Sequence, residues 1–341
     1  MMAGKQTKLF LGVGSGLLEV TGNGSWNVRP MGLMGTGGIR GLVIDAKDPD
    51  RMYAATLRAG VQRSRDGGRT WEDANEGVLY LEGYSICQQP QTAELYLGTQ
   101  PASVFKSSDG GDSWTDCSKL RDMEETLFWT FPQAPHIAHV RDIQVSAVDP
   151  KLVYGAVEEG WVVHSNDGGD SWVTLKQGVE FDSHAVTLMP DDVNVVLATS
   201  GFGVYRSEDG GRTFDRSDEG IKGQLGGGYM SPAVVHPKRP NTLYAAAAEV
   251  PPPWWRTRKP GANSHFFRSD DQGRSWQQLQ HGDEVITGGP RAIAIDPEDP
   301  DRVFFGLMNG GLWMTEDGGK SVNKVLEGLE GPVGAIQFAR Q

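Results

Sequence analysis

The segment SRDGGRTW at residues 64–71 recurs along the chain as SSDGGDSW at 107–114, SNDGGDSW at 165–172, SEDGGRTF at 207–214, SDDQGRSW at 269–276 and TEDGGKSV at 315–322. A degenerate further copy, TGNGSWNV, stands at 21–28. The Asp residues of the six clear copies are spaced 43, 58, 42, 62 and 46 residues apart. A period in the low forties, lengthened by two insertions, is typical of one four-stranded propeller blade per repeat.

The residues before each copy predict strands. One run ends in a Pro-containing turn, as in LVIDAKDP at 42–49, and is followed by a second run, MYAATL at 52–57, and a third, GVQRS at 60–64. Short β-branched and aromatic runs punctuated by Gly, Pro and Asp indicate strands rather than helices. The start of the chain, 8–28, predicts three strands without an innermost one, and GPVGAIQFARQ at 331–341 predicts the missing strand.

We therefore predict an all-β fold with a single seven-bladed propeller of four-stranded blades, closed by pairing of N-terminal strands with the C-terminal strand. The propeller is expected to occupy residues 1–341 as one domain. The expected blades are 38–76, 83–118, 140–178, 183–217, 228–280, 288–325, and 332–341 together with 6–30, with lid-like insertions at 118–139 and 249–265.

The repeated segment itself is predicted to be structural. Its Asp accepts nearby backbone N–H groups, its glycines adopt backbone conformations closed to other residues, and its Trp or Phe packs between neighbouring blades. A calcium loop would need more oxygen ligands at alternate positions than these turns offer.

The pattern S-x-D-G-G-x-[ST]-W resembles the Asp-box, or BNR-repeat, propellers. This superfamily includes sialidases, sortilin-type receptors, xyloglucan-cleaving glycosidases and photosystem II assembly factors. The resemblance covers nearly the whole chain and implies the propeller fold, but these families share the turn and not one chemistry. A sialidase would have six repeats and an Arg-Ile-Pro element, to which GIRG at 38–41 is the nearest approach.

Composition excludes several classes of function. The net charge of −12 argues against binding of a nucleic-acid backbone, which requires a basic surface. The chain has no apolar stretch of about 18 residues, so we expect no membrane association. With two cysteines and no secretory pattern at the amino terminus, the expected location is the cytoplasm.

Strand direction predicts which face carries the function. The repeated turns join the third and fourth strands of each blade, so the loops between the second and third strands, and the crossings to the next blade, lie on the opposite face. Both insertions fall on that opposite face. Long loops at one end of a rigid scaffold usually carry function, although they are also tolerated as surface excursions.

Alignment of the innermost strands on their terminal turns predicts a polar ring near the central channel: Arg40, Tyr84, Gln144, His184, Ser231, Arg291 and Gly334. Two guanidinium groups, Arg40 and Arg291, flank the glycine and are expected to clamp a carboxylate or phosphate. The alternative is that the channel is simply polar and filled with water. Further expected ligand-binding residues are Arg141, Arg58, Glu249, Trp129 and Trp255, although the tryptophans could instead anchor their own loops.

General acid–base chemistry is the expected reaction type. We predict catalytic roles for His184 paired with Asp142 or Glu159, and for Tyr84, because a histidine titrates near neutrality and burial tunes a carboxyl group. Glu158 and Glu159 could instead be a solvated loop pair. No cofactor or metal is expected; His139 and His184 are the candidate ligands if a metal binds, but their spacing is not typical of a metal motif.

Two hypotheses follow. In the first, the chain is a hydrolase, with glycosidase-like or lactonase- or esterase-like chemistry, acting in a central pocket on a small anionic or carbohydrate-like molecule. In the second, it is a non-catalytic interaction or assembly-factor module that holds a protein partner on the same face, as the PPPWW stretch at 251–255 suggests. The sequence does not define the oligomeric state.

Overall fold

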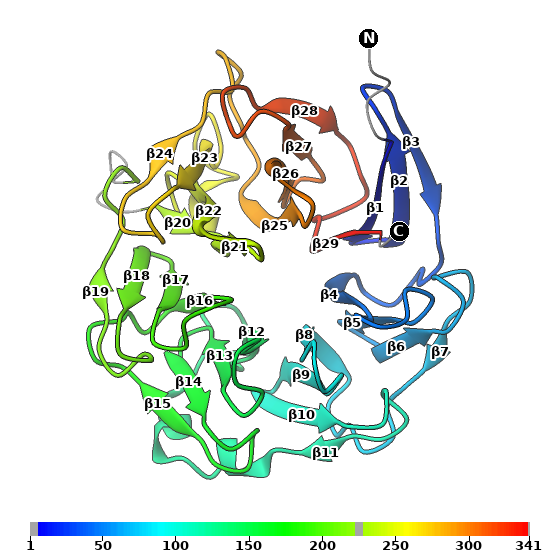
Figure 1. The fold of residues 1–341 in the computed structure, drawn as a ribbon, viewed down its shortest axis with the longest axis vertical. Coiled ribbons are helices and arrows are strands. Elements are labelled where there is room, and N and C mark those ends of the chain that lie inside the picture. Colours follow the sequence, from blue (N-terminus) through cyan, green and yellow to red (C-terminus); the bar gives the residue numbers. More distant parts are fainter. Residues whose placement is uncertain (1–5, 222–227, 340–341) are drawn as a thin grey trace.

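In a computed structural model the chain forms seven antiparallel blades arranged in a ring around a central axis (Figure 1). The structure describes residues 6–221 and 228–339. Residues 1–5, 222–227 and 340–341, which belong to the predicted range 1–341, lie outside the described residues. The predicted fold class is confirmed. None of the helices in the described part of the chain is long and apolar enough to span a membrane.

The ring closes through a blade built from both ends of the chain, as predicted. Strand β29 (Ala335–Phe338) lies innermost and is followed outward by β1 (Thr7–Val13), β2 (Gly16–Gly22) and β3 (Trp26–Pro30). β1 and β29 pair antiparallel, with Leu11 opposite Ile336. We call this blade 7. Because this blade combines both ends of the chain, it completes the ring.

The other blades follow in chain order and are numbered 1 to 6. Listed from the innermost strand outward, blade 1 is β4 (Ile39–Ile44), β5 (Met52–Thr56), β6 (Gly60–Ser64) and β7 (Glu72–Asp73); blade 2 is β8 (Glu82–Gln88), β9 (Leu95–Gln100), β10 (Ser103–Ser107) and β11 (Thr115–Asp116); blade 3 is β12 (Val140–Val145), β13 (Val153–Val157), β14 (Val162–Ser165) and β15 (Val173–Leu175).

Blade 4 is β16 (Ser183–Leu188), β17 (Val196–Ser200), β18 (Gly203–Ser207) and β19 (Asp215–Arg216); blade 5 is β20 (Tyr229–Met230) and β21 (Val234–His236), then β22 (Arg239–Ala248), β23 (Ser264–Ser269) and β24 (Gln277–Gln278); blade 6 is β25 (Pro290–Asp296), β26 (Asp299–Leu307), β27 (Leu312–Thr315) and β28 (Asn323–Leu326). The two insertions carry short 3₁₀ helices, η1 (Ser118–Leu120), η2 (Glu124–Phe128) and η3 (Pro252–Trp254).

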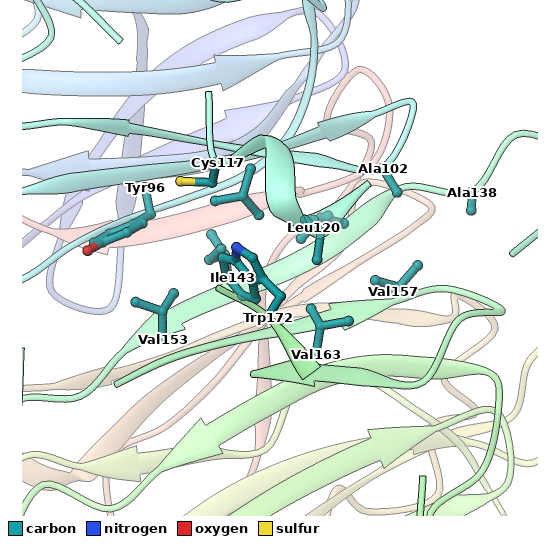
Figure 2. Packing of buried hydrophobic residues seen from close by; sticks show 12 residues of the cluster. Tyr96, Ala102, Cys117, Leu120, Ala138, Ile143, Val153, Val157, Val163 and Trp172 are labelled. Atoms are coloured by element: carbon teal, nitrogen blue, oxygen red, sulfur yellow. The ribbon is translucent and has the colours of Figure 1, made fainter. Parts of the chain in front are cut away.

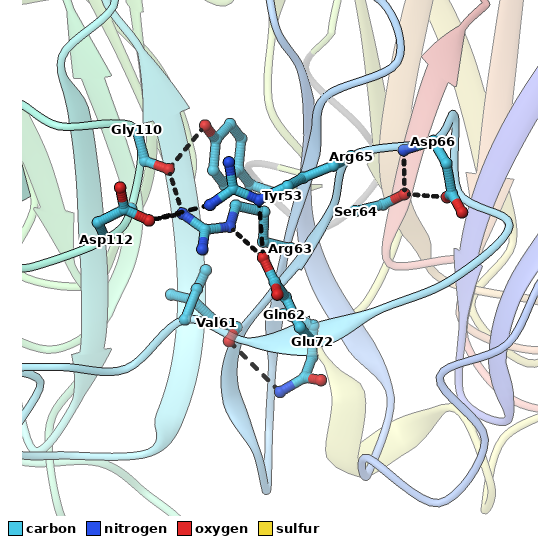
Figure 3. A network of polar contacts seen from close by, with 12 residues as sticks. Tyr53, Val61, Gln62, Arg63, Ser64, Arg65, Asp66, Glu72, Gly110 and Asp112 are labelled. Carbon is cyan, nitrogen blue, oxygen red and sulfur yellow. Dashed lines mark hydrogen bonds and ion pairs between the residues drawn. The ribbon is translucent and has the colours of Figure 1, made fainter.

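Each repeated turn is held by its own side chains. Asp66 Oδ1 accepts the N–H of Thr70 at 2.8 Å, and the Thr70 hydroxyl donates to Asp66 Oδ2 at 2.7 Å. The Ser64 hydroxyl donates to Asp66 (Figure 3). It also accepts the N–H of Gly68. Gly67 and Gly68 have φ of +72° and +84°, where a side chain would be strained. The carboxylate is thus fully used in shaping the turn.

The same turn also joins neighbouring blades. Tyr53 of β5 donates its hydroxyl hydrogen to the carbonyl of Gly110 in the next repeated turn, at 3.0 Å, and Arg63 donates to that carbonyl at 2.8 Å and to Asp112 (Figure 3). In the opposite direction, the indole N–H of Trp114 donates to the carbonyl of Ala74 in the preceding blade, at 2.8 Å.

The hydrophobic core lies between blades. Figure 2 shows the cluster between blades 2 and 3, where Tyr96, Ile143, Val153 and Trp172 pack together and are buried. Leu120 of η1 is fully buried in the same cluster, so the first insertion is anchored on the interface between these blades. Because each blade is covered on both faces, the ring behaves as a rigid support for the residues at its axis.

Candidate functional site

Five of the innermost strands share an irregularity at the same end. The pairing of β4, β8, β12, β16 and β25 with the next strand skips one residue, which is Arg40, Tyr84, Arg141, His184 and Arg291 in turn. Such a bulge leaves one residue outside the ladder of hydrogen bonds and redirects its side chain. In blade 7 the neighbouring position is Gly334, where a Cβ atom would lie 2.1 Å from the carbonyl oxygen of Ile39. The ring thus presents five polar side chains and one gap.

This arrangement differs from the predicted ring at two blades. In blade 5 the predicted residue, Ser231, is buried and bonds through its N–H and its hydroxyl to the carbonyl of Ala246. In blade 3 the bulged residue is Arg141, whereas Gln144 lies three positions further along β12. The Ser146 hydroxyl accepts the N–H groups of Val148 and Asp149, as Asp45 does for Lys47 and Asp48 in blade 1. The turn of blade 3 therefore starts at Ser146 rather than at Asp149, and counting five residues back from it gives Arg141.

Glu158 lies at the centre of a buried polar cluster. Its Oε1 atom lies 2.7 Å from a guanidinium nitrogen of Arg141, and its Oε2 atom lies 3.0 Å from Nε2 of His139. Burial opposes ionisation of this carboxyl group, but Arg141 and the bond from His139 hold its pKa well below the ordinary value. Glu158 is therefore an ionised buried carboxylate, and not a solvated loop residue.

Three arginines, Arg40, Arg141 and Arg291, interact with Glu158. Burial, together with repulsion from Arg40 and Arg141, lowers the pKa of Arg291 to about 9. Burial also lowers the pKa of Arg40, whose guanidinium lies 5.9 Å from the centre of the Tyr84 ring. Within the described residues, Nε of Arg291 is buried and has no hydrogen-bond partner. Three guanidinium groups therefore repel one another in a buried setting, and a negative charge among them would offset that repulsion.

Aromatic rings flank the charged groups. The ring of Tyr84 lies 3.8 Å from that of His139, centre to centre, and the ring of Tyr229 lies 4.5 Å from that of His184. Arg141 donates to the hydroxyl of Tyr229 at 3.2 Å. Trp255 in the second insertion reaches Tyr229, with ring centres 5.6 Å apart. This insertion therefore adds an aromatic side chain to the cluster.

A second carboxylate region lies beside His184. Nε2 of His184 lies 3.3 Å from Oδ2 of Asp182, and its Nδ1 lies 2.9 Å from the carbonyl oxygen of Met230. Burial and the nearby charges of Asp182 and Glu158 raise the pKa of Glu159, whose backbone has a positive φ of 53°. The backbone N–H groups of residues 160 and 161 bond to the carbonyl of Phe181, which places this turn against Asp182.

Asp182 and Tyr229 were not among the predicted site residues. Asp182 precedes His184 by two positions, and residues so spaced on an extended segment share a face, which is a signal that could have identified it. Tyr229 is the first residue of β20 in blade 5, where the sequence GGGYMSP gives no comparable signal.

Other predicted residues have structural partners. Asp142 accepts the N–H of Val186 at 3.0 Å and a hydrogen from the Gln144 amide at 3.0 Å, so it ties β12 to β16, and burial raises its pKa. The carboxylate that lies beside the His184 ring is that of Asp182. Glu249 accepts a hydrogen from the Asn263 amide at 2.6 Å and holds the base of the second insertion.

Two further residues that were predicted to bind the ligand are Trp129, in the first insertion, and Arg58, in the loop after β5. Trp129 packs against the core between blades 2 and 3. Arg58 is exposed, and its backbone N–H bonds to the carbonyl of Thr36.

Cavities occur away from this cluster. The larger has a volume of about 1340 Å³ and lies at the axis end that carries the repeated turns, lined in part by Asp50, Gly67, Arg302 and Phe338. A smaller one of about 390 Å³ lies in blade 6 beside Trp313 and Lys324.

Comparisons with known proteins identify the fold class. No family model matches the chain. A Neosartorya fischeri protein named Probable oligoxyloglucan-reducing end-specific xyloglucanase is 27% identical over 202 residues, which are 54% of this chain and 22% of that protein. The chain thus spans about a fifth of the length of this relative.

Solved structures agree on the propeller. The GH74 xyloglucanase from Xanthomonas campestris matches with a TM-score of 0.70 and 18% identity, over 95% of this chain and 53% of that one. YCF48 bound to D1 peptide matches with a TM-score of 0.54 and 18% identity, over 84% of this chain and 81% of that one. The chain is a seven-bladed β-propeller with structural neighbours in both groups.

Proposed function

We propose that the chain is a hydrolase that binds a small anionic, sugar-like substrate at the cluster of Arg40, Arg141 and Arg291. The observation that carries this proposal is the buried Nε of Arg291, which has no hydrogen-bond partner among the described residues although the group lies beside two further guanidinium groups. An anion placed there would accept these hydrogen bonds and offset the repulsion, as a carboxylate or phosphate does in a bidentate pair.

The neighbouring groups supply acid–base chemistry. The raised pKa of Glu159 favours its protonated form, which can donate a proton to a leaving oxygen. His184, next to Asp182, is positioned to take the proton of an attacking water. The water oxygen would bond to the electrophilic carbon while the bond to the leaving oxygen breaks. Tyr84 and Tyr229 would line the substrate, with Trp255 behind Tyr229.

The relatives support a hydrolytic reading. Both the curated relative and the Xanthomonas campestris structure are named as xyloglucanases, which cleave a carbohydrate. The present chain corresponds to 22% of the first and 53% of the second, so an activity for this chain rests on its own cluster.

A pair of substitutions tests the proposal. Arg291→Met and Arg40→Met remove one guanidinium each, and Arg58→Met, at an exposed loop position, is the matched control. Thermal unfolding is measured with added phosphate, citrate and glucuronate, and hydrolysis is measured on nitrophenyl esters, lactones and nitrophenyl glycosides. We expect the wild type and Arg58→Met to gain stability with at least one anion, because a ligand of the native state raises the unfolding temperature.

The two cluster variants are expected to lose this gain while unfolding at an equal or higher temperature in anion-free buffer. If both variants keep the anion-dependent shift of the wild type, the anion site lies elsewhere and the proposal is wrong.

A non-catalytic role is the second candidate. Leu127, Phe128 and Trp254 are exposed large apolar side chains on the two insertions, a feature of surfaces that hold a protein partner. The structural neighbour YCF48 was solved with a bound peptide. Anion binding that depends on Arg291, without hydrolysis of any compound in the panel, would favour a module that holds the carboxylate of a peptide.

A further inference from the structure

The imidazole of His184 is held in one orientation by the backbone. Its Nδ1 lies 2.9 Å from the carbonyl oxygen of Met230, and because a carbonyl oxygen only accepts, Nδ1 carries the hydrogen. In a neutral ring this leaves a lone pair on Nε2. That atom lies 3.3 Å from Oδ2 of Asp182, which is also an acceptor. Two acceptors facing each other require a cation between them or a proton on Nε2.

The ring has no other means of satisfying this atom. The side chain of His184 is 0% exposed, so bulk solvent does not supply the missing partner. Among the described residues, Nε2 makes no hydrogen bond. A buried polar atom in this state is costly unless a partner is supplied.

A carboxylate oxygen of Glu158 lies near His184 and Asp182, which gives three possible metal ligands. Carboxylate oxygens of Glu158 and Asp182 and a ring nitrogen of His184 all lie within 4.8 Å of one another. Glu159 lies close enough to sense these groups, since burial and the charges of Asp182 and Glu158 raise its pKa. Cations also face these groups: Arg141 and, when protonated, His139 contact Glu158, Arg40 and Arg291 interact with it electrostatically, and His136 acts on Glu159. The feature that favours a cation is the meeting of two carboxylates with an imidazole nitrogen that has no hydrogen-bond partner among the described residues.

We propose that Glu158, Asp182 and His184 bind one divalent transition-metal ion, such as Zn²⁺ or Mn²⁺. Imidazole and carboxylate are donors that such ions accept, and a set of three protein ligands leaves a position open for water. Bonds of about 2.0–2.2 Å in a tetrahedral site place two ligands of one ion about 3.3–3.6 Å apart. Nε2 of His184 and Oδ2 of Asp182 already lie 3.3 Å apart, whereas donors as much as 4.8 Å apart must approach each other by up to about 1.4 Å. Asp182 can make this movement because its side chain is 26% exposed.

The surrounding groups fit such a site. The carbonyl of Met230 fixes the tautomer of His184, and His139 and Arg141 orient Glu158, as outer partners of metal ligands commonly do. The role of the ion rests on the proposed function, whereas its binding does not. Bound water would lose its proton more readily and attack the substrate, and His184 would then hold the ion rather than a proton.

The experiment measures ion binding directly. Protein freed of metals with EDTA is titrated calorimetrically with Zn²⁺ and with Mn²⁺, and its visible spectrum is recorded with Co²⁺. The variants are Asp182→Asn, which keeps the shape of a half-buried side chain, and His184→Gln. Folding of each variant is checked by thermal unfolding in EDTA. We expect one ion per wild-type chain, and binding weakened at least about 10- to 100-fold in both variants, with loss of the Co²⁺ spectrum.

His281→Ala is the matched control, because a second histidine pair could take up metal. Nδ1 of His265 lies 3.3 Å from Nε2 of His281 on the outer part of blade 5. Ion binding that survives His281→Ala and is lost in Asp182→Asn supports the proposal. Absence of binding to the wild type, or binding that is lost only in His281→Ala, overturns it and leaves a protonated His184 paired with Asp182.

The result is separable from the anion site. Anion-dependent stabilisation is measured in EDTA, with Arg291→Met as the variant that removes it. If the wild type binds no metal ion but is still stabilised by an anion, only the proposed metal site is refuted. If the wild type binds the ion but no anion raises its unfolding temperature, only the proposed function is refuted.

Discussion

The guanidinium of Arg141 lies 2.7 Å from Oε1 of Glu158, and the two side chains are only 8% and 11% exposed. Arg141 stands at the bulge of β12, whereas Glu158 follows the end of β13 in the same blade. The pair therefore joins the innermost strand to the loop face and fixes the carboxylate in the polar cluster.

Glu158→Gln is expected to destabilise the fold strongly. Removing one partner of a buried ion pair leaves an uncompensated charge and costs about 3–5 kcal/mol. Here the charge left behind joins Arg40 and Arg291, which already repel Arg141. The free energy of unfolding is measured in urea with EDTA present. Glu125→Gln, which removes the partly exposed partner of the exposed Lys176, should change it by less than about 1 kcal/mol. Equal effects of the two substitutions would contradict the buried pair.

The repeated turns predict the response of stability to acid. Hydrogen bonds from the Ser or Thr four residues later lower the pKa of Asp66, Asp109, Asp167 and Asp209 to about 2. An unfolded Asp has a pKa of about 3.9, so the unfolded chain binds more protons between these values. The stabilisation is therefore complete above about pH 4 and is lost as the pH falls towards 2.

The urea midpoint is recorded between pH 2 and 5 for the wild type, Asp109→Asn and Asp283→Asn. The first variant should show a shallower acid decline, because it has lost one low-pKa carboxylate. Asp283 is exposed outside the repeated turns, and its variant should follow the wild type. A wild-type midpoint that does not change across this range would refute the explanation.

Gly334→Ala is expected to disturb ring closure. A Cβ atom there would lie 2.1 Å from the carbonyl oxygen of Ile39, so the backbone of β4 or of the segment before β29 must move. We expect the free energy of unfolding to fall by about 3 kcal/mol, at the upper end of the cost of overpacking. We also expect a smaller anion-dependent rise in unfolding temperature, because Arg40 follows Ile39 and would move with it.

Gly328→Ala is the control for this substitution. Position 328 has φ of +71° and open space within 4 Å, so its cost is about 1 kcal/mol from backbone strain alone. If the anion-dependent rise in unfolding temperature is the same in both variants as in the wild type, ring closure does not influence the arginine cluster and this prediction is wrong.

The fold was predictable because the same turn sequence recurs in each blade. Six copies of one turn set the blade length, and the unmatched strands at the two ends indicated closure of the ring. The polar ring was partly predictable because a fixed distance separates each bulge from its following turn. That count failed in blade 3, where a Ser146 hydroxyl replaces the usual carboxylate or amide and hides the start of the turn.

The contacts within the cluster could not be predicted in the same way. The turn at 158–161 meets Phe181 through backbone bonds between adjacent blades, and this placement brings Glu158 and Glu159 to Asp182. No repeat encodes that contact, because it joins two different blades through residues that differ from copy to copy. Its consequence, a carboxylate-rich half beside an arginine-rich half, appears only in three dimensions.

The five bulged residues have a consequence for how such a chain can change. A residue outside the ladder can be exchanged without altering the hydrogen bonds of its blade, and these positions already hold arginine, tyrosine and histidine on one backbone geometry. The residues near the axis of the propeller therefore occupy equivalent backbone positions that accept different side chains. New ligand preferences are accessible by a few substitutions at four of these positions, whereas Arg141 must keep its buried pair with Glu158. A library restricted to the codons of Arg40, Tyr84, His184 and Arg291 would therefore vary the ligand-facing side chains while keeping the hydrogen bonds between strands.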